Sequence, residues 1–186
     1  MLIKICGLKR KEDIEYVNVL KPDLVGFVFA QSKRQISIDT AIKLKSMLNK
    51  DIKIVGVFRN DNINLIKKIV KLDIIDYIQL HGNENDEYIL KIKKFCNLPI
   101  IKAYQDSEYA DYILYDNLEP GSGKECSWKI INDKQFFLAG GININNISKA
   151  IKLNPYCVDI SSGVEINGNK DFNKMKELID RIRKDK

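Results

Sequence analysis

Histidine, cysteine, proline and tryptophan are all scarce in this sequence of 186 residues, which contains one His, four Cys, four Pro and one Trp. The cysteines are Cys6, Cys96, Cys126 and Cys157, and no two of them form a Cys-x-x-Cys pair. Zinc and similar ions need clustered Cys and His ligands, so this spacing predicts no metal site. Unpaired cysteines are typical of reducing compartments, and we therefore expect a cytoplasmic protein with free thiols.

Long hydrophobic runs are also absent. No stretch of 18 apolar residues occurs, so we expect no membrane-spanning helix and no membrane partner. The first ten residues, MLIKICGLKR, lack the continuous apolar segment of a signal peptide. The composition, 45% hydrophobic and 30% charged, excludes collagen-like and disordered chains and predicts a folded globular protein.

Arginine is rare as well, because only five of the 31 basic residues are Arg and the other 26 are Lys. The formal net charge is +6, and a basic excess can indicate a surface for nucleic acid. Here the lysines are spread along the chain among Asp and Glu, which is typical of solvated helix faces. We expect no nucleic-acid partner. The alternative class is a non-catalytic protein that docks nucleic acid, which salt-dependent DNA or RNA affinity would reveal.

What the sequence does contain is a regular alternation of short apolar runs and longer helical patterns. Eight runs are nearly continuously apolar, as strands buried on both faces of a parallel sheet should be. These runs are Leu2–Cys6, Asp23–Phe29, Lys53–Phe58, Ile74–Gln79, Pro99–Ala103, Tyr112–Tyr115, Gln135–Ala139 and Cys157–Ile160. The alternation predicts an α/β protein with a single (β/α)8 TIM barrel domain over residues 1–186. That length is short for this fold, which typically takes about 250 residues.

Helix signals lie between the predicted strands. The expected helix starts and caps are Asp39, Asp61 or Asn62, Asn85 before Glu87–Phe95, Asn145 before Asn146–Leu153, and Asp171. Only eight residues separate Ala103 from Tyr112. A crossover connection with its helix needs about a dozen residues or more. We therefore expect a compact barrel in which the fifth helix is missing or reduced to a short link.

Polar residues and glycines follow nearly every predicted strand. In a (β/α)8 barrel the carboxyl ends of the strands meet at one rim, where the reacting groups gather. Cys6 ends the first strand and Asp116 the sixth, so the two can face each other as general base and general acid. Each also has a structural interpretation, Cys6 as a small buried hydrophobe and Asp116 as a turn former. The rim position of Cys6, just before Gly7, favours catalysis.

Glycine-containing motifs follow the last two predicted strands. Gly140-Gly141 and Ser162-Gly163 occupy corresponding loops, and glycine lets backbone N–H groups approach an anion closely. The loops after the last two strands are the usual phosphate site of such barrels, so we expect Gly140, Gly141, Ser162 and Gly163 to bind a phosphorylated small molecule. Asp159, at the end of the eighth strand, is expected to help bind the same substrate.

Arg34 and His81 complete the expected site. Arg34 follows the second strand, and its planar guanidinium suits a substrate carboxylate, although a surface charge is the alternative. His81 follows the fourth strand and is placed among the substrate-binding residues. A packing role or a hydrogen bond to a loop is an equally weighted alternative for His81.

Together these residues resemble the phosphoribosylanthranilate isomerases of tryptophan biosynthesis, and the resemblance runs in order along nearly the whole chain. The matching segments are KICG at 4–7, GFVF at 26–29, SKR at 32–34, VGVF at 55–58, QLHGNE at 79–84, IKA at 101–103, GSGK at 121–124, LAGGI at 138–142 and DISSGVE at 159–165, followed by Gly168 and Lys170-Asp171.

The resemblance implies an Amadori rearrangement of N-(5′-phosphoribosyl)anthranilate to 1-(2-carboxyphenylamino)-1-deoxyribulose 5-phosphate, with no metal or organic cofactor. In that reaction the acid that matches Asp116 protonates the furanose oxygen and opens the ring to a Schiff base. The base that matches Cys6 then removes the C2 proton as a thiolate. Arg34 matches the residue that binds the anthranilate carboxylate, and the glycine loops match the phosphate grip. We expect a monomer, with a homodimer as the alternative.

The chain departs from the family pattern at two places. Lys33 stands where the family commonly has Pro, which would loosen the loop that carries Arg34. Cys126-Ser127 precede Trp128 where the family commonly has Phe-Asp. Other phosphate-binding barrels, such as sugar-phosphate epimerases and the aminoaldose isomerase of histidine biosynthesis, are the alternative enzymes. The latter has Asp at the position of Cys6, so Cys6 argues against it.

Overall fold

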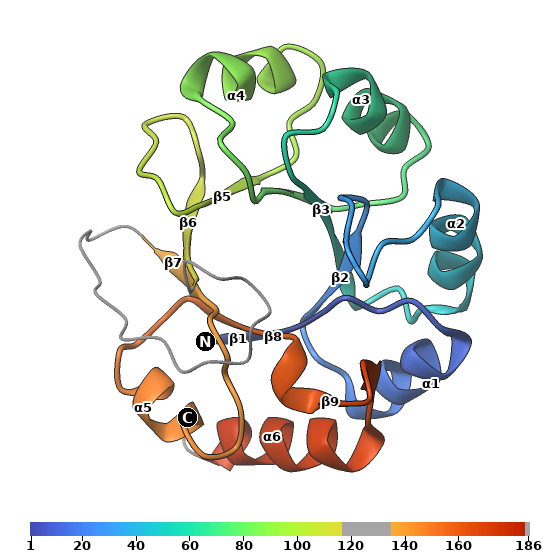
Figure 1. Ribbon diagram of the computed structural model, residues 1–186, viewed down its shortest axis with the longest axis vertical. Helices are drawn as coiled ribbons and strands as arrows, with labels where there is room; N and C mark the ends of the chain where they lie inside the picture. Colours follow the sequence, from blue (N-terminus) through green and yellow to red (C-terminus); the bar gives the residue numbers. More distant parts are fainter. Residues whose placement is uncertain (117–134, 185–186) are drawn as a thin grey trace.

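Eight parallel strands close into a barrel in the computed structural model, which describes residues 1–116 and 135–184 (Figure 1). The strands follow one another around the ring in chain order, and β8 pairs with β1 to close it. The strands are β1 (Leu2–Cys6), β2 (Leu24–Val28), β3 (Lys53–Phe58), β4 (Tyr77–Leu80), β5 (Ile100–Ala103), β6 (Tyr112–Tyr115), β7 (Phe136–Leu138) and β8 (Cys157–Ile160). The predicted (β/α)8 barrel is confirmed.

Helices surround the barrel on its outside (Figure 1). In the described part of the chain they are α1 (Lys11–Leu20), α2 (Ile38–Met47), α3 (Ile63–Lys71), α4 (Asp86–Lys93), α5 (Ile147–Ile151) and α6 (Phe172–Lys184). Asn62 and Asn85 cap α3 and α4 as predicted, because their side chains accept from backbone N–H groups of the first turn. α2 begins one residue before the predicted Asp39, since the hydroxyl of Ser37 caps it by accepting from the N–H of Thr40.

The predicted start of the fourth strand was wrong. Ile74 and Ile75 extend the apolar run, yet β4 begins only at Tyr77. Both isoleucines are buried in the turn between α3 and β4, where the N–H of Ile74 donates to the carbonyl of Ile69. Their apolarity therefore reflects packing against the outside of the barrel, and periodicity alone could not separate this from a strand.

The predicted cap of the helix after β7 was wrong by one residue. Asn146 holds the N-cap position of α5, and the helix ends at Ile151, earlier than predicted. The Asn146 side chain is buried and turns away from the helix. It accepts from the N–H of Asn143 at 2.8 Å and donates to the carbonyl of Gly141 at 3.0 Å. The asparagine thus stabilises the loop after β7.

No helix follows β5, since residues 104–111, all of them described, form turns and irregular structure. The turn is built on Ser107, whose hydroxyl accepts from the N–H groups of Tyr109 and Ala110. The same hydroxyl bonds the carboxylate of Asp86 on α4. The prediction that the fifth helix is missing is therefore confirmed for this link.

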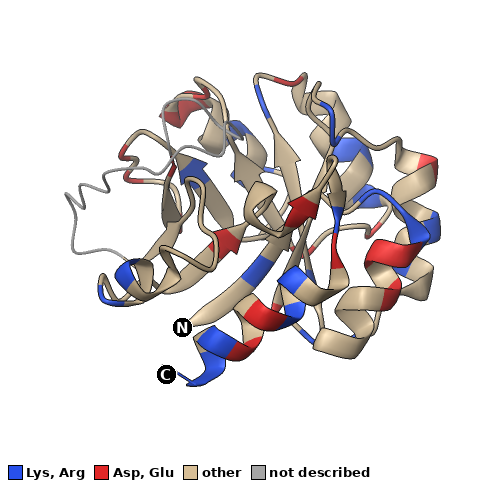
Figure 2. Ribbon diagram, turned by 60° about the horizontal axis from the view of Figure 1, so that its bottom comes forward, with Lys and Arg blue, Asp and Glu red and all other residues tan. Residues whose placement is uncertain are grey.

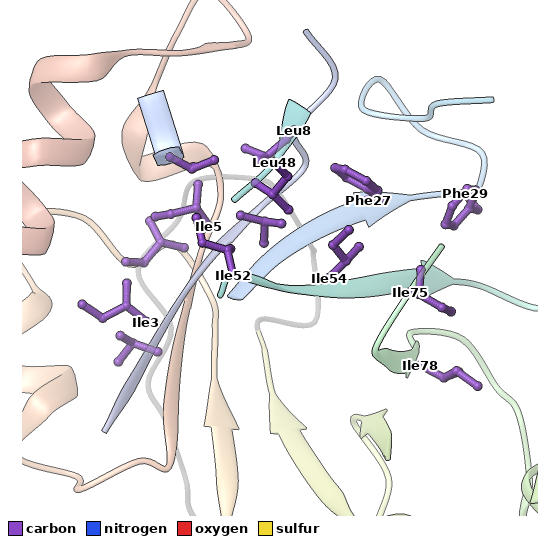
Figure 3. Packing of buried hydrophobic residues seen from close by; sticks show 14 of the residues in the cluster. Ile3, Ile5, Leu8, Phe27, Phe29, Leu48, Ile52, Ile54, Ile75 and Ile78 are labelled. Carbon is purple, nitrogen blue, oxygen red and sulfur yellow. The ribbon is translucent and has the colours of Figure 1, made fainter. Parts of the chain in front are cut away.

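The alternation of side chains along each strand divides the interior into two parts. Ile3 and Ile5 of β1 belong to the larger core between the barrel and its helices (Figure 3). Inside the barrel, an apolar layer consists of Leu24, Val55, Ile101, Leu114, Phe137 and Cys157. Next along the strands, toward their carboxyl ends, come three polar side chains, Lys4, Gln79 and Asp159, which are 0%, 1% and 7% exposed. This polar layer forms the floor beneath the rim.

Charged side chains of both signs are mixed over the outer helices (Figure 2). On α6 the ammonium of Lys176 pairs with the carboxylate of Asp180 at 2.6 Å, and on α4 Lys91 pairs with Glu87 at 2.8 Å. Such i,i+4 pairs are typical of solvated helix faces. Among the helices that the structure describes, none has the length and apolarity needed to span a bilayer.

Candidate active site

A cavity of about 180 Å³ opens at the carboxyl ends of the barrel strands. Every residue predicted for the site lines it, with the exception of Gly163. The predicted residues that line it are Cys6, Arg34, His81, Asp116, Gly140, Gly141, Asp159 and Ser162. The GSGK segment at 121–124, which matches the family, and the departures from the family pattern at Cys126, Ser127 and Trp128 lie outside the described residues.

Cys6 ends β1 with its thiol at the mouth of the barrel, and it is 9% exposed. Its partner across the sheet is Gly26 of β2, where a Cβ would lie 2.5 Å from Cys6 Sγ. The glycine therefore makes room for the thiol. Burial raises the pKa of the Cys6 thiol, while the ammonium groups of Lys4 and Lys170 act to lower it. A thiolate at this position depends on those two cations.

Lys4 and Asp159 form a buried ion pair directly below the cavity. Lys4 Nζ lies 2.6 Å from Asp159 Oδ2. Burial alone would lower the pKa of Lys4, but the charge and hydrogen bond of the Asp159 carboxylate outweigh it and hold the pKa above its ordinary value. The other carboxylate oxygen, Oδ1, is buried without a hydrogen-bond partner among the described residues. Asp159 was expected at the site, whereas Lys4 was missed, although a lysine inside a buried apolar strand was a visible signal.

Asp116 and His81 meet across the rim from the ends of β6 and β4. The Nε2 atom of His81 lies 3.1 Å from Asp116 Oδ2 and 3.0 Å from the hydroxyl oxygen of Tyr104. The rings of His81 and Tyr104 stand perpendicular, with their centroids 5.1 Å apart. Burial and the neighbouring Asp116 charge raise the pKa of Tyr104, which keeps its hydroxyl protonated. Tyr104 was missed, because it lies in the irregular link after β5.

Gln79 joins this group to the floor of the cavity. Its amide nitrogen lies 2.8 Å from His81 Nδ1, and its amide oxygen accepts from Lys4 Nζ at 2.8 Å. Gln79 lines the cavity together with Arg59, and neither was among the expected site residues. Gln79 occupies an inward position of β4, so its place in the alternation was the signal that could have found it.

Arg34 reaches the cavity from the loop after β2, and its guanidinium already holds a carboxylate. Nε and Nη2 donate to the two carboxylate oxygens of Glu165 at 2.7 and 2.8 Å. The ammonium of Lys170 lies 2.8 Å from the same carboxylate. Burial favours a higher pKa, but Arg34 and Lys170 outweigh it and lower the pKa of Glu165 to about 2. Arg34 lies over Gly7, where a Cβ would overlap its side chain.

The glycine loops after β7 and β8 lie against each other. Gly140 and Gly141 both have positive φ angles, 94° and 71°, which favour glycine. No described residue accepts a hydrogen bond from their N–H groups. Gly163 lies behind the cavity in the 3₁₀ turn η1 (Ser162–Val164), and a Cβ there would overlap the carbonyl oxygen of Ile142. Gly163 thus brings the two loops together, while Ser162 lines the cavity.

The side chains of the site suit acid–base chemistry and not the binding of a metal ion. Within residues 1–116 and 135–184, no group of three or more His, Cys, Asp and Glu side chains could hold a metal ion. The groups that converge on the cavity include the Cys6 thiol, the Asp116 carboxyl group bonded to His81, the Arg34 guanidinium and a pair of glycines. This arrangement suits proton transfer on a small molecule that carries two anionic groups.

Comparison with known proteins identifies close relatives. A family profile described as "N-(5'phosphoribosyl)anthranilate (PRA) isomerase" matches residues 3–181. The protein named N-(5′-phosphoribosyl)anthranilate isomerase of Endomicrobium trichonymphae is 46% identical, over 97% of this chain and 98% of the relative. The relative of the same name from Clostridium acetobutylicum is 45% identical, over 98% of both chains.

Solved structures of the same family share the fold. Phosphoribosyl anthranilate isomerase from Thermus thermophilus superposes with a TM-score of 0.87 at 30% identity, over 99% of both chains. Another phosphoribosyl anthranilate isomerase, solved in complex with reduced 1-(o-carboxyphenylamino)-1-deoxyribulose 5-phosphate, gives a TM-score of 0.82 at 30% identity, again over 99% of both chains.

Proposed function

The chain belongs to the N-(5′-phosphoribosyl)anthranilate isomerase family. We propose that its cavity carries out the Amadori rearrangement of N-(5′-phosphoribosyl)anthranilate, with Cys6 as general base and Asp116 as general acid. The activity is that of an isomerase of tryptophan biosynthesis. The observation that carries the assignment of roles is that both residues line one cavity, from the ends of β1 and β6.

Two anionic groups of the substrate fix its orientation. We assign the phosphate to the loops after β7 and β8, where Gly140, Gly141 and Ser162 line the cavity. The anthranilate carboxylate goes to Arg34, which keeps N–H donors beyond the two that it gives to Glu165. The ribose then lies between Cys6 and Asp116. Fixing both ends supplies the orientation that proton transfer requires.

The reaction needs two proton transfers with side chains of this protein, one from Asp116 to the substrate and one from the substrate to Cys6. Asp116 donates a proton to the furanose oxygen, the C1–O bond breaks, and the electrons of the anilino nitrogen form the C1=N bond of a Schiff base. Cys6, as thiolate, removes the proton from C2, and the C–H electrons form a C1=C2 double bond as the C1=N bond opens to the amine. The resulting enolamine takes a proton at C1 and releases its O2 proton to give the ketone. No redox partner is involved.

The state of Cys6 supports this division of roles. Burial raises the pKa of its thiol, and Lys4 and Lys170 counteract part of that effect. A thiol with two buried cations nearby is suited to act as a base, because the cations stabilise the anion that removes the proton. Asp159 completes the floor by holding Lys4 in place at 2.6 Å.

Fluorescence of the anthranilate group measures consumption of phosphoribosylanthranilate directly. Cys6→Ser and Asp116→Asn should each reduce kcat by roughly 100-fold or more, the contribution of a positioned acid or base. Circular dichroism and the unfolding midpoint should stay those of the unchanged protein. Near-normal kcat in either variant would overturn its assigned role. Cys96→Ser, at a half-buried thiol outside the cavity, is the matched control.

One chain supplies every residue to which this proposal gives a role, and we therefore propose that a monomer is active. Sedimentation together with activity measured over a range of protein concentrations tests this. A specific activity that falls on dilution would show that an assembly is needed. The unpaired thiols of Cys6, Cys96 and Cys157 support action in a reducing compartment such as the cytoplasm.

A further inference from the structure

Four side chains form a continuous row of hydrogen bonds across the mouth of the barrel. Lys4 Nζ lies 2.8 Å from Gln79 Oε1, and Gln79 Nε2 lies 2.8 Å from His81 Nδ1. His81 Nε2 lies 3.1 Å from Asp116 Oδ2. Lys4 and Gln79 are at most 1% exposed, and the side chains of His81 and Asp116 are 13% and 10% exposed. The row therefore links Lys4, the cation beside the proposed base Cys6, to the proposed acid Asp116.

Lys4 determines which way the Gln79 amide faces. An ammonium group has three donors and no acceptor, so the Gln79 atom beside it is the carbonyl oxygen. Asp159 takes a second Lys4 hydrogen bond at 2.6 Å and keeps the lysine charged. The amide nitrogen of Gln79 must then face the imidazole. Turning the amide over would place two donors against each other in a buried site, where an unsatisfied donor is costly.

Gln79 in turn determines the tautomer of His81. The amide nitrogen only donates, so Nδ1 must accept and carries no hydrogen. The ring hydrogen is therefore on Nε2, which faces Asp116 and Tyr104. His81 is thus held as a neutral ring with its N–H directed at the acid.

We propose that Lys4 and Gln79 hold His81 as the neutral Nε2–H tautomer, and that His81 acts as the positioning residue for Asp116 throughout the reaction. This rests on the proposed role of Asp116 as general acid. The Nε2–H of His81 donates to Oδ2 of Asp116. After Asp116 has given its proton to the furanose oxygen, the same N–H stabilises the carboxylate that remains. His81 keeps its proton in both states and carries none to the substrate.

The single histidine of the chain makes the tautomer directly observable. Protein without a histidine tag, labelled with ¹⁵N-histidine, gives one imidazole in long-range ¹H–¹⁵N NMR spectra. We expect a hydrogen-bearing Nε2 and a hydrogen-free Nδ1 at neutral pH, both free and with a product analogue bound. A protonated Nδ1 in either state overturns the proposal. This measurement does not depend on turnover, so it separates the tautomer from the catalytic assignment.

Gln79→Glu tests whether this row of hydrogen bonds sets the tautomer of His81. A carboxylate at position 79 would accept from Nδ1–H while still pairing with Lys4. We expect Nδ1 to become protonated and kcat to fall about 100-fold, with KM changed by less than about threefold. If His81 is neutral with its hydrogen on Nδ1, Nε2 accepts the hydrogen bond of the Asp116 carboxyl proton, which is then directed away from the substrate. If His81 is an imidazolium, its Nε2–H pairs with Asp116 as a carboxylate, which has no proton to give. Either outcome removes the acid.

Gln105→Glu is the matched control, since it makes the same change at an exposed position after β5 and should leave both the spectrum and kcat unchanged. Two results with Gln79→Glu would overturn the proposal. One is an Nδ1 that stays free of hydrogen, and the other is a protonated Nδ1 with kcat within about twofold of the unchanged enzyme. If the variant does not fold, the spectrum of the unchanged protein still decides. The expected spectrum combined with inactivity on phosphoribosylanthranilate would overturn the proposed function and leave the tautomer standing.

Discussion

Arg34 and Glu165 lie 131 residues apart in sequence and form a bidentate ion pair at the edge of the cavity. The carboxylate binds one edge of the guanidinium and leaves donors of Arg34 for a substrate. Lys170 holds the same carboxylate from the other side at 2.8 Å. Glu165 therefore fixes the direction in which Arg34 points.

Glu165→Gln should raise KM about tenfold while lowering kcat much less, because one neutral amide oxygen cannot hold both N–H groups of Arg34. Steady-state kinetics on phosphoribosylanthranilate measure both constants. Glu177→Gln, on an exposed position of α6, is the control and should change neither. A fall in KM would mean instead that Glu165 competes with the substrate carboxylate.

The same carboxylate should contribute to stability in a pH-dependent way. Its pKa of about 2 lies below the ordinary 4.5, so its contribution is fully present above about pH 4.5 and disappears as the pH falls toward 2. The difference in the free energy of unfolding between the unchanged protein and Glu165→Gln should shrink over that range. Urea unfolding at several pH values measures it, and a difference independent of pH would contradict the prediction.

Gly26→Ala should act on the thiol of Cys6. The new Cβ would lie 2.5 Å from Sγ and must displace it, so we expect kcat to fall about 100-fold. Gly56→Ala introduces a Cβ of the same size against side chains of Ile75 and Phe58. That control should lower stability and leave kcat of the folded fraction close to normal. Equal losses of kcat in both variants would mean that packing alone is responsible.

Removing one partner of the Lys4–Asp159 pair should destabilise the barrel strongly. Lys4→Met leaves a buried carboxylate without its cation, which costs about 3–5 kcal/mol of unfolding free energy. Asp159→Asn should have a similar effect, and the double variant should lose clearly less than the sum of the two. Chemical denaturation of the four proteins measures the coupling. Additive losses would show that the two charges do not depend on each other.

The strands could be predicted because each is a run buried on both faces, and the tight β5–β6 link could be predicted from chain length. The same rule was wrong at Ile74 and Ile75, because residues that pack outside a barrel are as apolar as those within it. The cap predicted at Asn145 was wrong by one residue, because Asn146 occupies the N-cap position while its side chain bonds the loop at Gly141.

The rim residues Cys6, Arg34, His81 and Asp116 could be found because the carboxyl ends of parallel strands must meet at one rim. Their partners could not be found in that way. The pairing of Arg34 with Glu165 depends on side-chain direction across two loops, and the orientation of His81 depends on a lysine three strands away. Sequence position indicates which groups meet at a rim, whereas hydrogen bonds determine the state of each.

Lys102 is a buried lysine on β5, the strand that no helix follows. It alternates with the inward-facing Ile101 and Ala103, so it is on the outer face of the strand, yet it is only 1% exposed. Its ammonium donates to the carbonyls of Gly82 and Ala103 and lies 3.5 Å from Glu84. The Lys102 side chain thus ties β5 to the loop that follows β4. The buried ammonium of Lys102 therefore anchors the end of β5 to the preceding loop, on the side of the barrel where no helix follows the strand.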